Sequence, residues 1–212
     1  MATHELTSGL NPSQKDAVTH TVGPLLVLAG AGSGKTRVLT NRIAYLIAEK
    51  GISPYQILAI TFTKKAAGEM KERVAGLVGP KAENMWVSTF HSACARMLRS
   101  KATLLGYGSN YNIYDQADSK TLTKEALLNV GLDVKLAGTY QSLISRAKNE
   151  AKNPLELIEE LRDFHNPVPP NFEAVYQTYE QLKRVNNAMD FDDLLSNVVE
   201  LFETSEETLL EY

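Results

Sequence analysis

The sequence predicts an α/β fold, with a parallel sheet in the first half of the chain and a mostly helical unit in the second half. Short apolar runs alternate with amphipathic segments up to about residue 114, a rhythm typical of parallel strands joined by crossover helices. Beyond residue 115 helical periodicity prevails. The division predicts two domains, residues 1–114 and residues 115–212.

The first apolar run, residues 25–29, is unbroken and is bounded by Pro24 and Gly30, as expected of a buried parallel strand. A helix should follow, because Leu39, Ile43 and Leu46 recur at helical spacing. The elements predicted in this half are strand 25–29, helix 36–50, strand 57–62, a helix through 67–77, strand 85–88, a helix through 94–98 and a short strand 111–114.

The second half contains four amphipathic patterns that predict helices at residues 122–130, 140–152, 172–185 and 191–202. Val175, Tyr179 and Leu182 form one apolar stripe on the third of them. The proline-rich segment 166–171 separates two of these helices and is interpreted as a stiff connector rather than a ligand for a proline-binding domain.

Composition narrows the functional classes. The formal net charge of −3 gives no global basic field, so contact with nucleic acid requires a local basic patch. The single cysteine, Cys94, excludes an internal disulfide framework and fits a reducing compartment. No secretion signal and no run of about 18 apolar residues is present, so we expect a soluble, cytoplasmic protein without a membrane partner.

A glycine-rich segment lies between the first predicted strand and the first predicted helix. Its glycines allow successive backbone N–H groups to face phosphate oxygens, Lys35 can reach the β- and γ-phosphates, and the Thr36 hydroxyl can ligate Mg²⁺. The segment departs from the general motif in having alanine at its first position. It predicts binding of a purine nucleoside triphosphate by residues Ala29, Gly30, Ala31, Gly32, Ser33, Gly34, Lys35 and Thr36.

Gln14 has two interpretations that the residues alone leave open. Its amide can pair with both the N6 amino group and N7 of adenine. Equally, Asn11, Pro12 and Gln14 form a good helix start, in which Asn11 is the N-cap and Gln14 completes a capping box. Arg37, beside the glycine-rich segment, can assist nucleotide binding or lie on a solvated helix face.

Two further segments contain polar or aromatic groups. Phe62 ends the predicted strand at 57–62 and provides a ring on which a base could stack, and Thr63 and Lys64 follow it. A solvated helix face beside a core phenylalanine is the more ordinary interpretation of such residues. The carboxylates at 190, 192 and 193 resemble a metal cluster, but Asp190 as N-cap and Asp193 at the third helical position explain two of them structurally.

Read together, five segments resemble motifs of superfamily-one DNA helicases of the UvrD/PcrA/Rep group, with the PcrA-like members nearest. They are residues 10–14, 29–36, 60–67, 88–92 and 190–195. The resemblance spans nearly the whole chain, and the alanine at the start of the phosphate loop is this family's own variant. Lys64 departs from the pattern, because the family commonly has asparagine there, although a lysine can still contact a phosphate.

The resemblance implies a RecA-like P-loop NTPase sheet, incomplete here, with a mostly helical inserted subdomain. It implies an ATP-dependent 3′–5′ DNA helicase of repair or replication, with ATP and Mg²⁺ as cofactors and single-stranded DNA, or duplex with a single-stranded tail, as partner. It assigns adenine recognition to Gln14, nucleotide contact to Arg37, and DNA contact to Phe62, Thr63 and Lys64. His91 is implied in DNA contact too, although packing at a helix start would also explain it.

ATP hydrolysis also requires an acidic residue for Mg²⁺ and a group that orients water. In the resembling family both come from an acidic motif after a downstream strand, and this sequence contains no apolar strand followed by Asp-Glu. We therefore expect the chain to be the N-terminal part of a longer enzyme and to have no appreciable turnover alone.

Three other interpretations are compatible with the phosphate loop. The motor part of a helicase-nuclease differs in a downstream nuclease sequence. A P-loop small-molecule kinase needs an acceptor pocket and leaves the segment at residues 60–67 unexplained. A non-catalytic, nucleotide-dependent interaction module would bind ATP without turnover. Binding of single-stranded DNA separates the helicase interpretations from the kinase.

Overall fold

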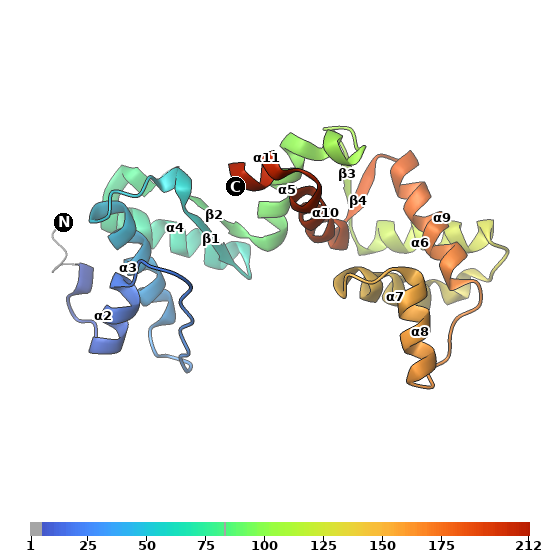
Figure 1. The fold of residues 1–212 in the computed structure, drawn as a ribbon, viewed down its shortest axis with the longest axis horizontal. Helices are drawn as coiled ribbons and strands as arrows, with labels where there is room; N and C mark the ends of the chain where they lie inside the picture. The colour runs from blue at the N-terminus through green and yellow to red at the C-terminus, as the bar shows by residue number, and fades with distance from the viewer. Residues whose placement is uncertain (1–5, 83) are drawn as a thin grey trace. The chain divides into compact units, whose positions relative to one another are not determined.

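The computed structural model describes residues 6–82 and 84–212, and the chain divides into two compact units. Unit 1 comprises residues Met1–Phe90 and unit 2 comprises His91–Tyr212. Figure 1 shows the helices and strands of each.

Unit 1 is built from helices that pack beside one short sheet. Its described elements are α2 (Pro12–Thr19), α3 (Lys35–Ala48), the 3₁₀ turn η1 (Pro54–Gln56), β1 (Leu58–Thr61), α4 (Lys64–Val78), the 3₁₀ turn η2 (Gly79–Ala82) and β2 (Trp86–Thr89). β1 and β2 pair in parallel, with Leu58 opposite Trp86 and Thr61 opposite Thr89. The predicted strands at 57–62 and 85–88 and the helix at 36–50 are therefore confirmed.

The core of unit 1 lies where α3 and α4 meet the sheet. Ile43 and Ile47 of α3 pack with Ala59 of β1 and with Met70 and Val74 of α4. These helix residues recur at four-residue spacing, which places them on one face of each helix. Burial of this face holds α3, whose N-terminus follows the glycine-rich segment, in a fixed position.

The predicted first strand, residues 25–29, is wrong. The segment has no regular secondary structure, and Figure 1 shows an irregular loop between α2 and α3. Leu26 and Leu28 are 83% and 87% exposed. A strand needs hydrogen-bonding neighbours, and within residues 6–82 and 84–212 β1 and β2 pair only with each other. The predicted multistranded sheet is thus a two-stranded one.

Unit 2 is mostly helical, as predicted. Its elements are α5 (Phe90–Lys101, starting at the last residue of unit 1), α6 (Gln116–Asn129), α7 (Ala137–Asn149), α8 (Pro154–Asp163), α9 (Phe172–Val185), α10 (Phe191–Thr204), α11 (Glu206–Glu211), the 3₁₀ turns η3 (Ala102–Leu105) and η4 (Val134–Leu136), and the strands β3 (Asn112–Tyr114) and β4 (Ala188–Asp190). The predicted helix at 172–185 matches α9 in both bounds.

The predicted strand at 111–114 is found as β3, but it does not join the sheet of unit 1. β3 pairs in parallel with β4, which is not among the predicted strands, and Tyr114 lies opposite Asp190. This pairing joins segments that are far apart in the sequence, so local periodicity does not indicate it.

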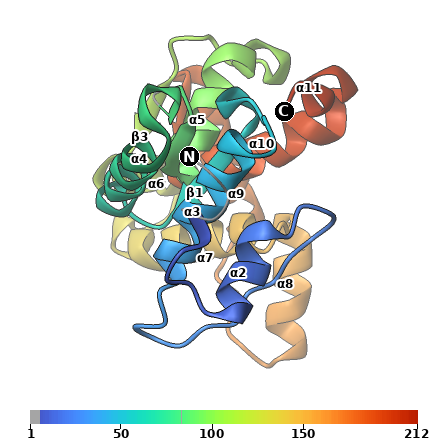
Figure 2. The same ribbon diagram turned by 90° about the vertical axis from the view of Figure 1, so that its left-hand side faces the viewer.

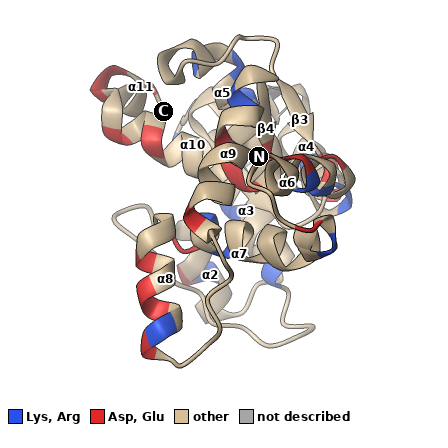
Figure 3. Cartoon of the chain, turned by 90° about the vertical axis from the view of Figure 1, so that its right-hand side faces the viewer, with Lys and Arg blue, Asp and Glu red and all other residues tan. Residues whose placement is uncertain are grey.

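The main core of unit 2 lies among α6, α7, α8 and α9. Tyr140, Leu157, Phe172, Val175 and Tyr179 are buried there. The connector at 166–171 has no regular structure and is anchored by the Tyr140 hydroxyl, which donates to the Pro170 carbonyl. Figure 3, in which Asp and Glu are red, shows several acidic positions along α8. No described helix in either unit is long and apolar enough to cross a membrane.

Candidate nucleotide site and DNA-contact segments

The glycine-rich segment turns sharply into α3. Gly32 and Gly34 have φ values of 74° and 84°, in the left-handed region that favours glycine. Gly34 is the N-cap of α3 and provides no side-chain cap. The first N–H groups of α3 are therefore left for another acceptor, and the N-terminus of a helix is a favourable place for an anion.

Lys35 opens α3 and folds back over the loop. Its Nζ donates to the carbonyl oxygens of Ala29 at 3.0 Å and Gly30 at 2.7 Å, and the Ser33 hydroxyl donates to the Gly30 oxygen at 2.7 Å. The side chains of Lys35 and Thr36 are exposed in the first turn of α3. Because these contacts lie at the surface, an incoming phosphate can compete with them for the ammonium group.

Gln14 lies at the same loop although it belongs to α2. Its Nε2 donates to the Ser33 carbonyl at 3.0 Å, and a Cβ at Gly34 would lie only 3.3 Å from this nitrogen. The predicted capping box is also confirmed, because Asn11 Oδ1 accepts from Gln14 N and Gln14 Oε1 accepts from Asn11 N. The structural interpretation of Gln14 is therefore correct, and its amide still borders the phosphate loop.

Arg37 contacts the segment before α2. Its Nη2 donates to the Ser8 carbonyl at 3.1 Å, and a Cβ at Gly9 would lie 3.0 Å from that nitrogen. Gly9 has a φ of 68°, so the close approach of the guanidinium and the backbone conformation both favour glycine. Arg37 thus links the phosphate loop's helix to the chain that leads to Gln14.

The donor set of this loop fits a polyphosphate. It combines N–H groups at a helix start, the Lys35 ammonium and the Thr36 hydroxyl. These are the kinds of group that bind phosphate and Mg²⁺ in P-loops. No cluster of three or more His, Cys, Asp or Glu side chains arranged to hold a metal ion is found among the described residues. Within those residues, the loop's candidate ligand for Mg²⁺ is the Thr36 hydroxyl.

The predicted DNA-contact segment of unit 1 lies between β1 and α4. Phe62 is 93% exposed, so it is not the core phenylalanine of the ordinary interpretation. Thr63 is the N-cap of α4, its hydroxyl oxygen accepts from Ala66 N at 3.1 Å, and the exposed Lys64 begins the helix. An exposed aromatic ring beside a helix N-terminus and a lysine is suited to stacking on a base and contacting a phosphate.

His91, the DNA-contact residue predicted in unit 2, lies exposed in the first turn of α5. Its ring packs edge-on against Phe191 of α10, with ring centroids 5.6 Å apart. The contact supports the packing interpretation of His91 and leaves its exposed face accessible.

The carboxylates at the start of α10 belong to a buried ion network. Asp190 is the N-cap and Asp193 the third helical residue, as predicted, and the two also form a capping box. Lys148 Nζ lies 2.8 Å from Asp190 and 2.7 Å from Asp193, and Lys183 Nζ lies 2.5 Å from Asp193. Glu180 lies 2.9 Å from both lysines. The structural interpretation of the carboxylates is therefore confirmed.

The network shifts the ionisation of its members in different directions. Burial raises the pKa of the Asp190 carboxyl, but the charges of Lys148 and Lys183 outweigh burial and hold this pKa below its usual range. For Asp193 burial dominates, and its pKa is raised. Burial of the Tyr176 side chain also raises its pKa, to about 12. No sequence pattern indicates that the two lysines are buried, since lysine is almost never fully buried unless it is paired.

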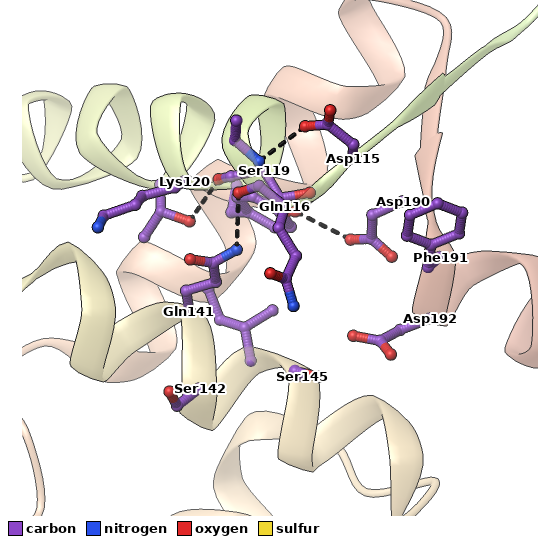
Figure 4. Close-up of a pocket in the computed structure, with 14 residues that line it drawn as sticks. Asp115, Gln116, Ser119, Lys120, Gln141, Ser142, Ser145, Asp190, Phe191 and Asp192 are labelled. Atoms are coloured by element: carbon purple, nitrogen blue, oxygen red, sulfur yellow. Dashed lines mark hydrogen bonds between the residues drawn. The ribbon is translucent and has the colours of Figure 1, made fainter.

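Unit 2 also contains a polar cavity of about 690 Å³, shown in Figure 4. Asp115 and Lys120 of the α6 segment, Gln141 of α7, and Asp190 and Asp192 lie on its wall. Gln141 Nε2 donates to the Gln116 carbonyl at 3.2 Å. None of the residues predicted to bind nucleotide or DNA lines this cavity.

Comparison with known proteins completes the description. Residues 10–212 match the family described as "UvrD/REP helicase N-terminal domain". The chain is 48% identical over 209 residues to proteins named "ATP-dependent DNA helicase PcrA" from Staphylococcus aureus strain Mu50 and from Staphylococcus epidermidis. The alignment covers 98% of this chain and 28% of each relative, so the chain spans little more than a quarter of the length of these relatives.

Proposed function

The chain belongs to the UvrD/REP helicase N-terminal domain family, and from this premise we propose that it is the ATP-binding and single-stranded-DNA-contacting part of an ATP-dependent 3′–5′ DNA helicase. Residues 1–114 would be the first part of a RecA-like motor domain and residues 115–212 its helical insertion. We also propose that the protein is cytoplasmic and acts in DNA repair or replication.

The observation that carries the nucleotide half of this proposal is the contact between Gln14 Nε2 and the Ser33 carbonyl. It joins the residue that can read adenine to the loop that can cradle phosphates, although they come from different elements. To bind both ends of ATP, Gln14 would exchange its present partners for the adenine edge. Lys35 would release the two loop carbonyls and neutralise the β- and γ-phosphates, and Thr36 would ligate Mg²⁺.

The DNA half rests on the exposure of Phe62 beside Thr63 and Lys64. Phe62 would stack on a base, while the N-terminus of α4 and Lys64 would contact the strand's phosphates. His91 would add a contact from unit 2. Within the whole enzyme, hydrolysis would open and close the motor domains around the strand, and we expect the present chain alone to bind without turnover.

The test is calorimetric titration of the chain with a non-hydrolysable ATP analogue and Mg²⁺, compared with the guanine analogue. We expect adenine-selective binding that both Gln14→Ala and Lys35→Ala weaken. The matched variant Lys124→Ala removes an exposed lysine of α6 and should bind as the wild type does. DNA-stimulated phosphate release that disappears in Lys35→Ala would contradict the expected lack of turnover.

A further inference from the structure

Helix α3 connects the two halves of the proposed nucleotide site. Its N-terminus carries Lys35 and Thr36, while one side of the helix packs against α2, whose first turn carries Gln14. Figure 2 shows α2, α3 and the loop that joins them. The distance from the Gln14 amide to the phosphate loop therefore depends on how α2 is docked on α3.

Asn41 holds the chain just before α2. Its side chain is buried, and its Nδ2 donates to the Leu6 carbonyl at 2.8 Å. Leu6 itself is buried in the small core between α2 and α3. A buried carbonyl that lost this donor would be left unpaired, which is unfavourable away from water. Asn41 thus fixes one end of the segment that carries Gln14.

Arg42 holds the other end. Its guanidinium donates to the Ala17 carbonyl at 2.7 Å and also to the His20 carbonyl. Both carbonyls lie at the C-terminus of α2, where helical partners run out and the helix dipole favours a cation. Arg42 therefore acts as a C-terminal cap that is supplied by the neighbouring helix.

Apolar packing alone would not fix this geometry. Leu10 and Val18 pack with Val38 and Tyr45, but the hydrophobic effect is non-directional and tolerates small shifts. Hydrogen bonds lose most of their strength when distance or angle is poor. The contact of Asn41 with the chain before α2 and that of Arg42 with the C-terminal end of α2 are thus directional restraints on the position of α2 along and around α3. The hydrogen bond from Arg37 to Ser8 adds a third restraint.

We propose that Asn41 and Arg42 are positioning residues that set adenine selectivity without touching the nucleotide. The inference rests on the proposed role of Gln14, because a two-point contact with adenine requires the amide to stay in register with the loop. Loosening α2 should weaken recognition of the base and leave the phosphate cradle at the start of α3 intact.

The experiment measures three affinities of the chain in the presence of Mg²⁺: for the non-hydrolysable ATP analogue, for the guanine analogue and for inorganic tripolyphosphate, which reports the loop alone. The variants are Asn41→Asp, Arg42→Gln and the milder Arg42→Lys, and Arg73→Gln removes an exposed arginine of α4 as the control. Thermal unfolding of each variant is followed in parallel.

In Asn41→Asp and Arg42→Gln we expect the preference for adenine over guanine to fall about tenfold, the equivalent of one lost hydrogen bond, with tripolyphosphate affinity unchanged. Arg42→Lys should recover part of the preference, because lysine keeps a cationic donor at the helix end. Arg73→Gln should match the wild type.

Equal losses for all three ligands would assign Asn41 and Arg42 a purely structural role and overturn the inference. An unchanged preference in the folded variants would also overturn it, while tripolyphosphate binding that Lys35→Ala abolishes would leave the proposed phosphate site standing. A wild-type chain that binds tripolyphosphate but does not prefer adenine would overturn the role of Gln14 and the inference together.

Discussion

The lysines of the phosphate loop and DNA-contact segment in unit 1 and the lysines of the ion network in unit 2 lie in opposite environments. In unit 1 Lys35 and Lys64 are exposed, and the hydrogen bonds of Lys35 go to carbonyls at the surface. In unit 2 the Lys183 side chain is 0% exposed and lies among carboxylates. Exposed ion pairs contribute about 0–1 kcal/mol, whereas removing one partner of a buried pair costs about 3–5 kcal/mol. Lys35 and Lys64 are therefore accessible to a ligand, whereas Lys183 maintains the fold of unit 2.

The largest difference in stability should appear when one lysine of each unit is replaced by alanine and the two variants are compared. Lys183→Ala leaves buried carboxylates with one cation fewer, and we expect a loss of about 3–5 kcal/mol in the free energy of unfolding of unit 2. Lys35→Ala should change the free energy of unfolding by less than about 0.5 kcal/mol. Urea titration measures both effects, with helical circular dichroism dominated by unit 2 and the fluorescence of Trp86, the single tryptophan, reporting unit 1.

If Lys35→Ala lowered the free energy of unfolding of unit 1 as much as Lys183→Ala lowers that of unit 2, the proposed difference between the two lysines would be contradicted. A shift of the Trp86 transition in Lys183→Ala would mean that unit 1 depends on unit 2 for its stability.

A smaller effect should appear in the pH dependence of unit 2. The lowered pKa of Asp190 means that its stabilising contribution is present above the unfolded pKa, about 3.9, and is lost as pH falls toward the folded value. Asp190→Asn keeps an N-cap but removes this titration. The difference in free energy of unfolding between wild type and variant should therefore narrow below about pH 4. Urea titrations at several pH values measure it, and a constant difference would contradict the assignment.

The smallest effects concern left-handed backbone positions. Gly34 in unit 1 and Ala151 in unit 2 have φ values of 84° and 51°. Gly34→Ala should destabilise unit 1 by about 1–2 kcal/mol and crowd Gln14. Ala151→Gly should stabilise unit 2 by up to about 1 kcal/mol, because glycine relieves the strain. Ala174→Gly, on an exposed helical position of α9, is the control and should cost about 1 kcal/mol.

Thermal unfolding ranks these three variants. If Ala151→Gly is as destabilising as Ala174→Gly, the left-handed conformation of Ala151 is not strained, and the comparison of the two positions fails.

Local signals in the sequence predicted most of the helices, since amphipathic spacing and capping residues act within one element. The Asn11 and Asp190 capping boxes are examples, because all their atoms lie within four residues. The prediction of a strand at 25–29 was wrong because a strand depends on contacts outside its own segment. An apolar run indicates a preference for burial, but a strand also requires partners elsewhere in the chain, and the described residues supply none.

The candidate site shows the same limit. Roles could be proposed for the residues of the phosphate loop from the sequence, because each residue type there has a distinct chemistry. The hydrogen bonds of Gln14 with Ser33 and of Arg42 with Ala17 of α2 could not be predicted, because they depend on tertiary packing. The burial of Lys148 and Lys183 could not be predicted from the sequence, because their partners Asp190 and Asp193 come from β4 and α10.

The pairing of β3 with β4 has a consequence for the folding kinetics of unit 2. The two strands enclose α6, α7, α8 and α9 within one long chain loop, and closing such a loop costs entropy before the pairing returns any stabilisation. The helices can form on local contacts within microseconds. In folding, the helices should therefore form first and β3 and β4 should pair last. The ion network at the Asp190 end of β4 should form only when the loop has closed.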